Sequence, residues 1–152
     1  MSYTRLIYHI VFRTKDSRRA ITIEHERELY RYIWGFVRSR GAVLGRIGGM
    51  PDHIHLLVEI PPEQAVSDFV KSLKLSANHY LQHHKDVFPQ FCGWARGYCA
   101  LSYSVNEREK IVNYIMKQKV HHRTRSFVDE LKVMLEESKI QYNQDYLLDD
   151  GL

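Results

Sequence analysis

The chain has 152 residues, of which 44% are hydrophobic and 26% are charged, and its net charge is +4. These values are typical of one globular domain and exclude a wholly disordered chain. No apolar run approaches the roughly 20 residues of a membrane span, and two cysteines, Cys92 and Cys99, are too few for a disulfide scaffold, so we expect a cytoplasmic protein.

Strand-like and helix-like segments alternate in the first half of the chain. Residues 4–13 are rich in β-branched and aromatic side chains and predict a strand, which a basic loop follows. Thr22 is suited to cap a helix that ends at Gly41. Residues 42–47 predict a second strand, residues 48–52 a tight turn, and residues 53–60 a third strand that two prolines stop.

The second half continues the alternation. Ser67 is suited to cap a second helix, and residues 98–104 predict a fourth strand. Asn106 and Glu109 have the spacing of a capping box, which predicts the start of a third helix. Residues 126–139 have apolar side chains at helical spacing and predict a last helix, which we interpret as an appendage or a dimer contact.

The C-terminal segment differs from the rest in charge. Residues 1–50 hold ten basic and four acidic side chains, whereas residues 125–152 hold three basic and seven acidic ones. This asymmetry favours a polyanion-binding body, although ordinary surface charge explains it equally well. We therefore divide the chain into a domain over residues 1–124 and an acidic C-terminal extension over residues 125–152, which is not a separate domain.

The order strand, helix, strand, strand, helix, strand is that of the ferredoxin-like split βαβ fold. We predict an α+β, RRM-like domain with an antiparallel sheet of four to five strands. Two helices would cover one face of the sheet, and an additional helix near the C-terminus would carry residue 114.

Two histidines share one face of the third predicted strand. Because side chains alternate along a strand, Ile54 and Leu56 face the core while His53 and His55 point to the opposite face. Both imidazoles can then reach one metal ion, and Asp52 is placed to orient one of them. A bare His-X-His pair is equally compatible with two partly exposed histidines without function.

The third predicted helix carries a second group of polar side chains. Tyr114 and Gln118 are four residues apart and therefore neighbours at the flank of the apolar stripe, with Lys110 and Lys117 beyond them. A boundary tyrosine and a solvated glutamine would give the same pattern. Together with the histidines, however, a phenol and a carboxamide suit phosphodiester transfer assisted by Mg²⁺ or Mn²⁺.

Four segments in a fixed order resemble one family. Residues 8–15, 49–58, 70–74 and 114–118 are similar to those of the single-tyrosine HUH transposases of small bacterial insertion sequences, including the REP-associated tyrosine transposases. The resemblance spans residues 3–120, and the combination of His-X-His with a downstream Tyr-X-X-X-Gln carries it.

The resemblance implies a metal-dependent DNA transposase. His53, His55 and Gln118 would bind a divalent ion, Mg²⁺ or Mn²⁺. Tyr114 would attack single-stranded DNA near a hairpin, giving a 5′-phosphotyrosine link and a free 3′-hydroxyl. The family also implies a homodimer, in which Tyr114 serves its own subunit or its partner's.

Basic residues are the candidates for contacts with DNA phosphates. They are Arg13, Lys15, Arg18, Arg19, Lys71 and Lys74. Tyrosine or tryptophan rings near them would stack on unpaired bases. The alternative is a domesticated protein of the same fold that binds single-stranded DNA or hairpins without transposing them.

Overall fold

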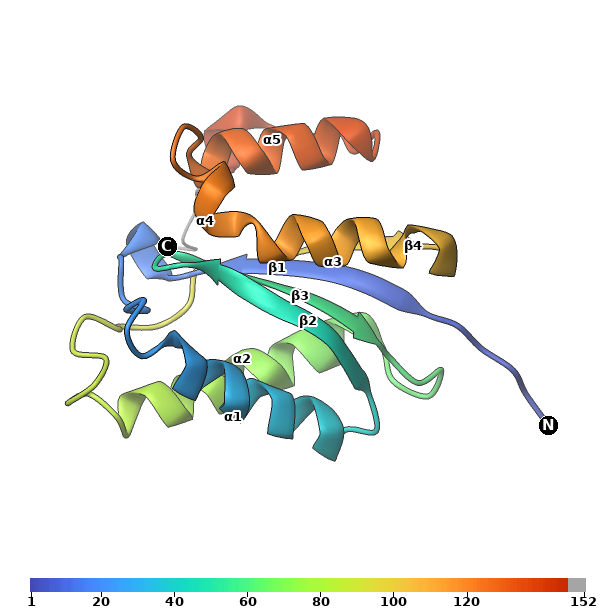
Figure 1. The fold of residues 1–152 in the computed structure, drawn as a ribbon, viewed down its shortest axis with the longest axis horizontal. Helices are drawn as coiled ribbons and strands as arrows, with labels where there is room; N and C mark the ends of the chain where they lie inside the picture. The colour runs from blue at the N-terminus through green and yellow to red at the C-terminus, as the bar shows by residue number, and fades with distance from the viewer. Residues whose placement is uncertain (148–152) are drawn as a thin grey trace.

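The structure, a computed structural model, describes residues 1–147 and centres on a four-stranded antiparallel sheet in the order β2-β3-β1-β4. The strands are β1 (Ile7–Arg13), β2 (Val43–Met50), β3 (His53–Glu59) and β4 (Cys99–Tyr103). Helices α1 (Glu26–Ser39) and α2 (Val66–Gln82) cover one face, and α3 (Arg108–Met116), α4 (Gln118–His121) and α5 (Phe127–Glu137) lie over the other (Figure 1). The ferredoxin-like prediction is confirmed.

The main core lies between the sheet and the first two helices. Ile54, Leu56 and Val58 of β3 are buried there against α1 and α2, as the alternation in the sequence predicts. On the opposite face, Leu57 packs with Ile111 of α3. Both faces of β3 are therefore buried, and its two histidines lie between the sheet and a second layer of helices.

The hairpin before His53 is tighter than predicted. Gly48 and Gly49 pair with His55 and Ile54 inside the β2–β3 ladder, so the turn consists of residues 51 and 52 alone. A Cβ atom on Gly49 would lie 2.3 Å from the carbonyl oxygen of His53. The glycines thus permit close pairing of two strands, and the turn predicted over residues 48–52 was too long.

Helix starts are shifted from their predicted caps. The residue before α1 is His25 rather than Thr22, and the residue before α2 is Ala65 rather than Ser67. Ahead of α3, the capping box is formed by Ser104 and Glu107 around a 3₁₀ turn, two residues before the predicted box. Several residues near each start have capping chemistry, and packing selects among them.

The helix predicted to carry both Tyr114 and Gln118 is broken between them. Lys117 has φ −96° and ψ 17°, which ends α3 at Met116 and lets α4 begin at Gln118. The break turns Gln118 towards the sheet, where its side chain is 1% exposed. The solvated glutamine that a continuous helix allows is therefore wrong.

Helix α5 packs on the sheet and is not a loose appendage. Its Phe127 and Met134 form a small cluster with Val11 of β1 and Leu101 of β4, and the Ser126 hydroxyl caps its first turn. The last five residues of the predicted acidic extension lie outside the described residues. Among residues 1–147, no helix combines the length and the apolar character needed to cross a membrane.

Candidate functional site

The two histidines of β3 are completely buried beneath α3, α4 and α5. Both His53 and His55 are 0% exposed, so the partly exposed pair that the sequence allows is wrong. Nδ1 of His53 lies 2.7 Å from Oδ1 of Asp52 in the preceding turn, as expected for a carboxylate that orients an imidazole. With its Nδ1–H donated to Asp52, His53 presents Nε2 to the interior of the site.

A third histidine, which sequence reasoning missed, orients His55. Nε2 of His9, on β1, lies 2.7 Å from Nδ1 of His55, and the side chain of His9 is also buried. Burial, followed by the nearby His55, lowers the pKa of His9 to about 3, so His9 is neutral and can accept a hydrogen bond. His55 then also presents Nε2 to the site.

Gln118 and Tyr114 both reach the histidines from the helical layer. Oε1 of Gln118 lies 3.0 Å from Nε2 of His53. The Tyr114 ring centre is 5.8 Å from that of His55 and 5.9 Å from that of His9. The structure therefore brings together the four residues that the sequence selected from β3 and the third helix.

Glu130 of α5 is the second residue that sequence reasoning missed. Its Oε1 lies 3.1 Å from Nε2 of His55 and 3.5 Å from Nε2 of His53. Its Oε2 accepts hydrogen bonds from the Tyr114 hydroxyl and, at 2.8 Å, from Nε2 of Gln118. A signal was present in the sequence, because Glu130 falls on the apolar face of α5, one turn from buried Phe127 and Met134.

His122 of the α4–α5 loop completes the group. Its Nε2 lies 3.1 Å from Oε1 of Glu130, and its ring centre is 4.6 Å from that of His53. In the sequence, His121 and His122 stand next to Arg123, and nothing in their spacing assigns either of them to this site. The position of His122 depends on the helix break after α3. The spacing of residues in the sequence does not predict that break.

The charges of the site are interdependent. Burial lowers the pKa of His53, but hydrogen bonds to Asp52 and Glu130 outweigh it and hold the pKa at about 9. Burial lowers the pKa of His55 to about 4 against the opposing effect of Glu130. Burial raises the pKa of Glu130, but hydrogen bonds from His122, His53 and His55 bring it far below its usual range. The cluster therefore keeps Glu130 ionised and favours the protonated form of His53, while His55 stays neutral.

The donor atoms fit a divalent cation. The ligand atoms of His53, His55 and Glu130 all lie within 4.8 Å of one another, and Gln118 adds an amide oxygen. Two imidazole nitrogens with two oxygens are compatible with Mn²⁺, Mg²⁺ and other divalent ions.

The cluster meets solvent beside Tyr114. A cavity of about 570 Å³ is lined by Tyr114 and His9 together with Lys110 and Lys117. The lysines that the sequence places beyond the tyrosine thus share its cavity. A polyanion entering there would meet positive charge next to the phenol.

The basic residues selected from the sequence fall into two groups. Lys15, Arg18, Arg19 and Lys71 are exposed. Arg13 is buried, and its Nη1 donates to Ser17 and to a backbone carbonyl. Nζ of Lys74 donates to the carbonyl oxygens of residues 95 and 97, at 2.7 and 3.0 Å, so this lysine also stabilises a loop.

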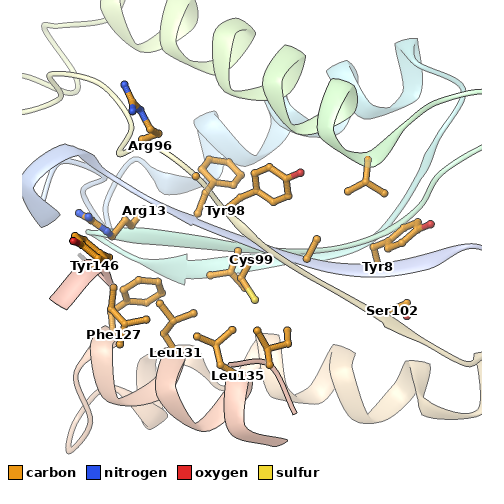
Figure 2. A pocket seen from close by; sticks show the side chains of 17 residues that line it. Tyr8, Arg13, Arg96, Tyr98, Cys99, Ser102, Phe127, Leu131, Leu135 and Tyr146 are labelled. Atoms are coloured by element: carbon orange, nitrogen blue, oxygen red, sulfur yellow. The ribbon is translucent and has the colours of Figure 1, made fainter. Parts of the chain in front are cut away.

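Three of these residues share one hollow. Lys15, Lys71 and Lys74 line a cavity of about 510 Å³ with the rings of Trp94 and Tyr98. Cations and aromatic rings in one hollow are suited to a nucleic-acid strand, which offers phosphates and unpaired bases. A further cavity of about 710 Å³ is lined by residues of β1, β4 and α5, and Figure 2 shows Arg13 and Arg96 near one end of it.

Comparison with known proteins finds similarity to one protein family. The family model described as Transposase IS200 like matches residues 2–118. The ISDra2 transposase TnpA of Deinococcus radiodurans is 31% identical over 118 residues, which cover 75% of this chain and 84% of that protein. The transposase for insertion sequence element IS200 of Salmonella typhimurium is 31% identical over 115 residues, covering 73% of this chain and 75% of that protein.

Two solved structures are similar as well. The crystal structure of a putative transposase from Deinococcus radiodurans has a TM-score of 0.60 and 28% identity, covering 77% of this chain and 93% of that one. A REP-associated tyrosine transposase bound to a REP hairpin also has a TM-score of 0.60, covering 80% of this chain and 72% of its own. With 15% identity, this second likeness concerns the fold alone.

Proposed function

Because the chain belongs to the IS200-like transposase family, we propose that it cleaves and rejoins single-stranded DNA at hairpin-marked ends through a phosphotyrosine intermediate. Tyr114 is the nucleophile. His53, His55 and Gln118 hold a divalent ion, Mg²⁺ or Mn²⁺, and Asp52 orients His53.

One observation carries this proposal. The single carboxylate of Glu130 contacts the Tyr114 hydroxyl with one oxygen and His55 with the other, at 3.1 Å from Nε2. The phenol and the imidazoles therefore flank a space about as wide as one small anionic group. A phosphate in that space would meet the nucleophile on one side and the metal ligands on the other.

The proposed reaction follows from this placement. The Tyr114 oxygen attacks phosphorus, the bond from phosphorus to the 3′-oxygen breaks, and the phenol proton passes, directly or through water, to the departing 3′-oxygen, so that a 5′-phosphotyrosine and a free 3′-hydroxyl result. Rejoining is the reverse attack by a 3′-hydroxyl. The metal ion, when bound, polarises the phosphate and stabilises the charge that develops on its oxygens.

The nucleophile depends on its surroundings. Burial, followed by the Glu130 carboxylate, raises the pKa of Tyr114, so the phenol is protonated while Glu130 lies beside it. Lys110 and Lys117, which line the same cavity, are placed to favour the phenolate and to attract the DNA backbone.

The hollow that contains Trp94 and Tyr98 supports the DNA part of the proposal. Lys15, Lys71 and Lys74 supply cations along it, and the two aromatic rings offer surfaces for unpaired bases. Arg18 and Arg19 extend the basic surface, and Arg13 stabilises the loop next to it. The structurally similar REP-associated transposase is bound to a hairpin, which makes a hairpin the substrate to test first.

The test of the nucleophile is a Tyr114→Phe protein given hairpin-bearing single strands and Mn²⁺. We expect it to bind DNA but to form no covalent adduct on a denaturing gel. Tyr103→Phe is the matched control, because Tyr103 lines the same cavity without contacting Glu130 through its hydroxyl. Undiminished cleavage by Tyr114→Phe would show that another group attacks the phosphate.

The test of the metal uses the wild-type protein. A chelator should abolish cleavage, and added Mn²⁺ or Mg²⁺ should restore it. Activity that survives chelation contradicts the metal site. If the wild-type protein with metal binds hairpins but cleaves none of a broad set of sequences, the chain is instead a DNA-binding protein of the same fold.

A further inference from the structure

Helix α5 lies beyond residue 118, where the match to the family model ends, yet it contributes Glu130 to the centre of the site. Within the described residues, Glu130 is a 1% exposed acidic side chain surrounded by imidazoles, an amide and a phenol. A buried carboxylate in such a position requires an explanation, because burying a charge is costly unless it is paired.

We propose that Glu130 is a fourth protein ligand of the metal ion, supplied by α5, and that a DNA phosphate takes its place when the substrate binds. This inference rests on the proposed metal site of His53, His55 and Gln118. It adds a carboxylate from a part of the chain that the family match does not reach.

The spacing of the donor atoms supports a ligand role. Around an ion with octahedral bonds of about 2.0–2.1 Å, ligand atoms at adjacent corners lie about 3 Å apart. Nε2 of His53 and Oε1 of Gln118 are 3.0 Å apart, and Nε2 of His55 and Oε1 of Glu130 are 3.1 Å apart. Glu130 is therefore spaced from His55 as Gln118 is from His53, and its Oε1 also lies 3.5 Å from Nε2 of His53.

Neighbouring groups hold the carboxylate in this orientation. Nε2 of His122 lies 3.1 Å from Oε1, and the Gln118 amide donates to Oε2 at 2.8 Å. The Gln118 side chain thus directs its oxygen to His53 and its nitrogen to Glu130. Such outer contacts are what fix a ligating carboxylate in metal sites.

The ligand role has a consequence for access to the site. Glu130 also accepts a hydrogen bond from the Tyr114 hydroxyl. Its carboxylate therefore occupies the space between the nucleophile and the metal ligands that a scissile phosphate needs. Its helix is held by a small apolar cluster beside the cavity of about 710 Å³, towards which Leu131 and Leu135 point (Figure 2). Exchange of this carboxylate for a phosphate would require Glu130 to leave its partners Tyr114, Gln118 and His122, with a movement of its side chain or of α5.

The first experiment measures Mn²⁺ binding to the DNA-free protein by calorimetry and by the electron paramagnetic resonance signal of free Mn²⁺. Glu130→Gln should weaken binding at least tenfold, because a charged ligand is lost. Glu137→Gln, the same change at an exposed position of α5, should bind Mn²⁺ as the wild type does. Unchanged or tighter binding by Glu130→Gln overturns the inference and leaves Glu130 as an ion-pair partner of His53.

The second experiment needs no variant of Glu130. Amide hydrogen exchange of α5 in the wild-type protein should slow at least tenfold when Mn²⁺ binds, since the ion would tie the helix to β3. Exchange of α5 that is indifferent to Mn²⁺ overturns the inference even if a Glu130 variant fails to fold.

One further variant separates this inference from the proposed function. His55→Ala should abolish specific Mn²⁺ binding, because His55 is common to both proposals. If His55→Ala binds Mn²⁺ as tightly as the wild type, the metal site itself is wrong and Glu130 has no ion to ligate. If Glu130→Gln binds Mn²⁺ as tightly as the wild type and His55→Ala does not, the proposed metal site is retained and the role of Glu130 as its fourth ligand is refuted.

Discussion

The distance between α3 and the sheet is set by a glycine, and this gives a direct test of how the site is assembled. A Cβ atom on Gly48 of β2 would lie 2.9 Å from the carbonyl oxygen of Ile115 and 3.0 Å from its Cγ2 atom. Ordinary contacts begin at 3.4 Å, so Gly48→Ala forces α3 outward by about half an ångström. The oxygen belongs to the helix backbone and cannot rotate away.

Two losses should follow in the Gly48→Ala protein. Overpacking costs about 2 kcal/mol, which lowers the melting temperature by roughly 4–8 °C in a chain of this length. Misplacing a catalytic group by about 1 Å lowers the reaction rate about 100-fold, so a displacement of about half an ångström should slow adduct formation by Tyr114 about tenfold. Calorimetry and a gel assay of the covalent adduct measure the two effects separately.

The matched control lies three residues earlier on the same strand. A Cβ atom on Gly45 would meet its nearest neighbours at 3.5 Å, an ordinary contact, so Gly45→Ala should melt within a few degrees of the wild type. If Gly48→Ala melts and reacts like Gly45→Ala, the close seating of α3 on β2 does not position the nucleophile, and the reasoning fails.

Three further substitutions test the groups around the site. Asp52→Ala removes the acceptor of the His53 Nδ1–H and should weaken Mn²⁺ binding about 10- to 100-fold in a calorimetric titration. His9→Phe removes the partner of His55 Nδ1 and should weaken Mn²⁺ binding to a similar degree, whereas equal affinity would exclude a positioning role for His9. Ser126→Ala removes the cap of α5 and should cost about 1 kcal/mol, seen as a lower melting temperature.

The sheet and its covering helices could be predicted because their signals are local. Alternation along β3 places Ile54 and Leu56 in the core and the histidines opposite, and the structure agrees. The ends of elements were less predictable. Gly48 and Gly49 have the composition of a turn, but they serve close pairing of β2 with β3, a requirement that depends on the partner strand and on α3.

The position of the two proposed metal ligands on β3 could be predicted from spacing, whereas the places of Glu130 and His9 in the site could not. His53 and His55 are two residues apart, so their common face follows from the strand alone. Glu130 reaches them across 75 residues of sequence, through a helix break at Lys117 and the docking of α5 on Val11 and Leu101. Contacts of that kind arise from tertiary packing, and the sequence offers only a charged residue on an apolar helix face.

The sequence leaves open the subunit in which Tyr114 acts, and within one chain Tyr114 already lies beside the proposed metal ligands. The Tyr114 ring lies 5.8 Å from the His55 ring of the same chain, and its hydroxyl donates to Glu130 of the same chain. We therefore predict that a mixture of Tyr114→Phe and His55→Ala proteins forms no covalent adduct. If the predicted homodimer instead exchanged its tyrosines, mixed dimers would rebuild one complete site, and about a quarter of the wild-type activity would return. Recovery of that size, with either variant inactive alone, would place the nucleophile in the partner's site.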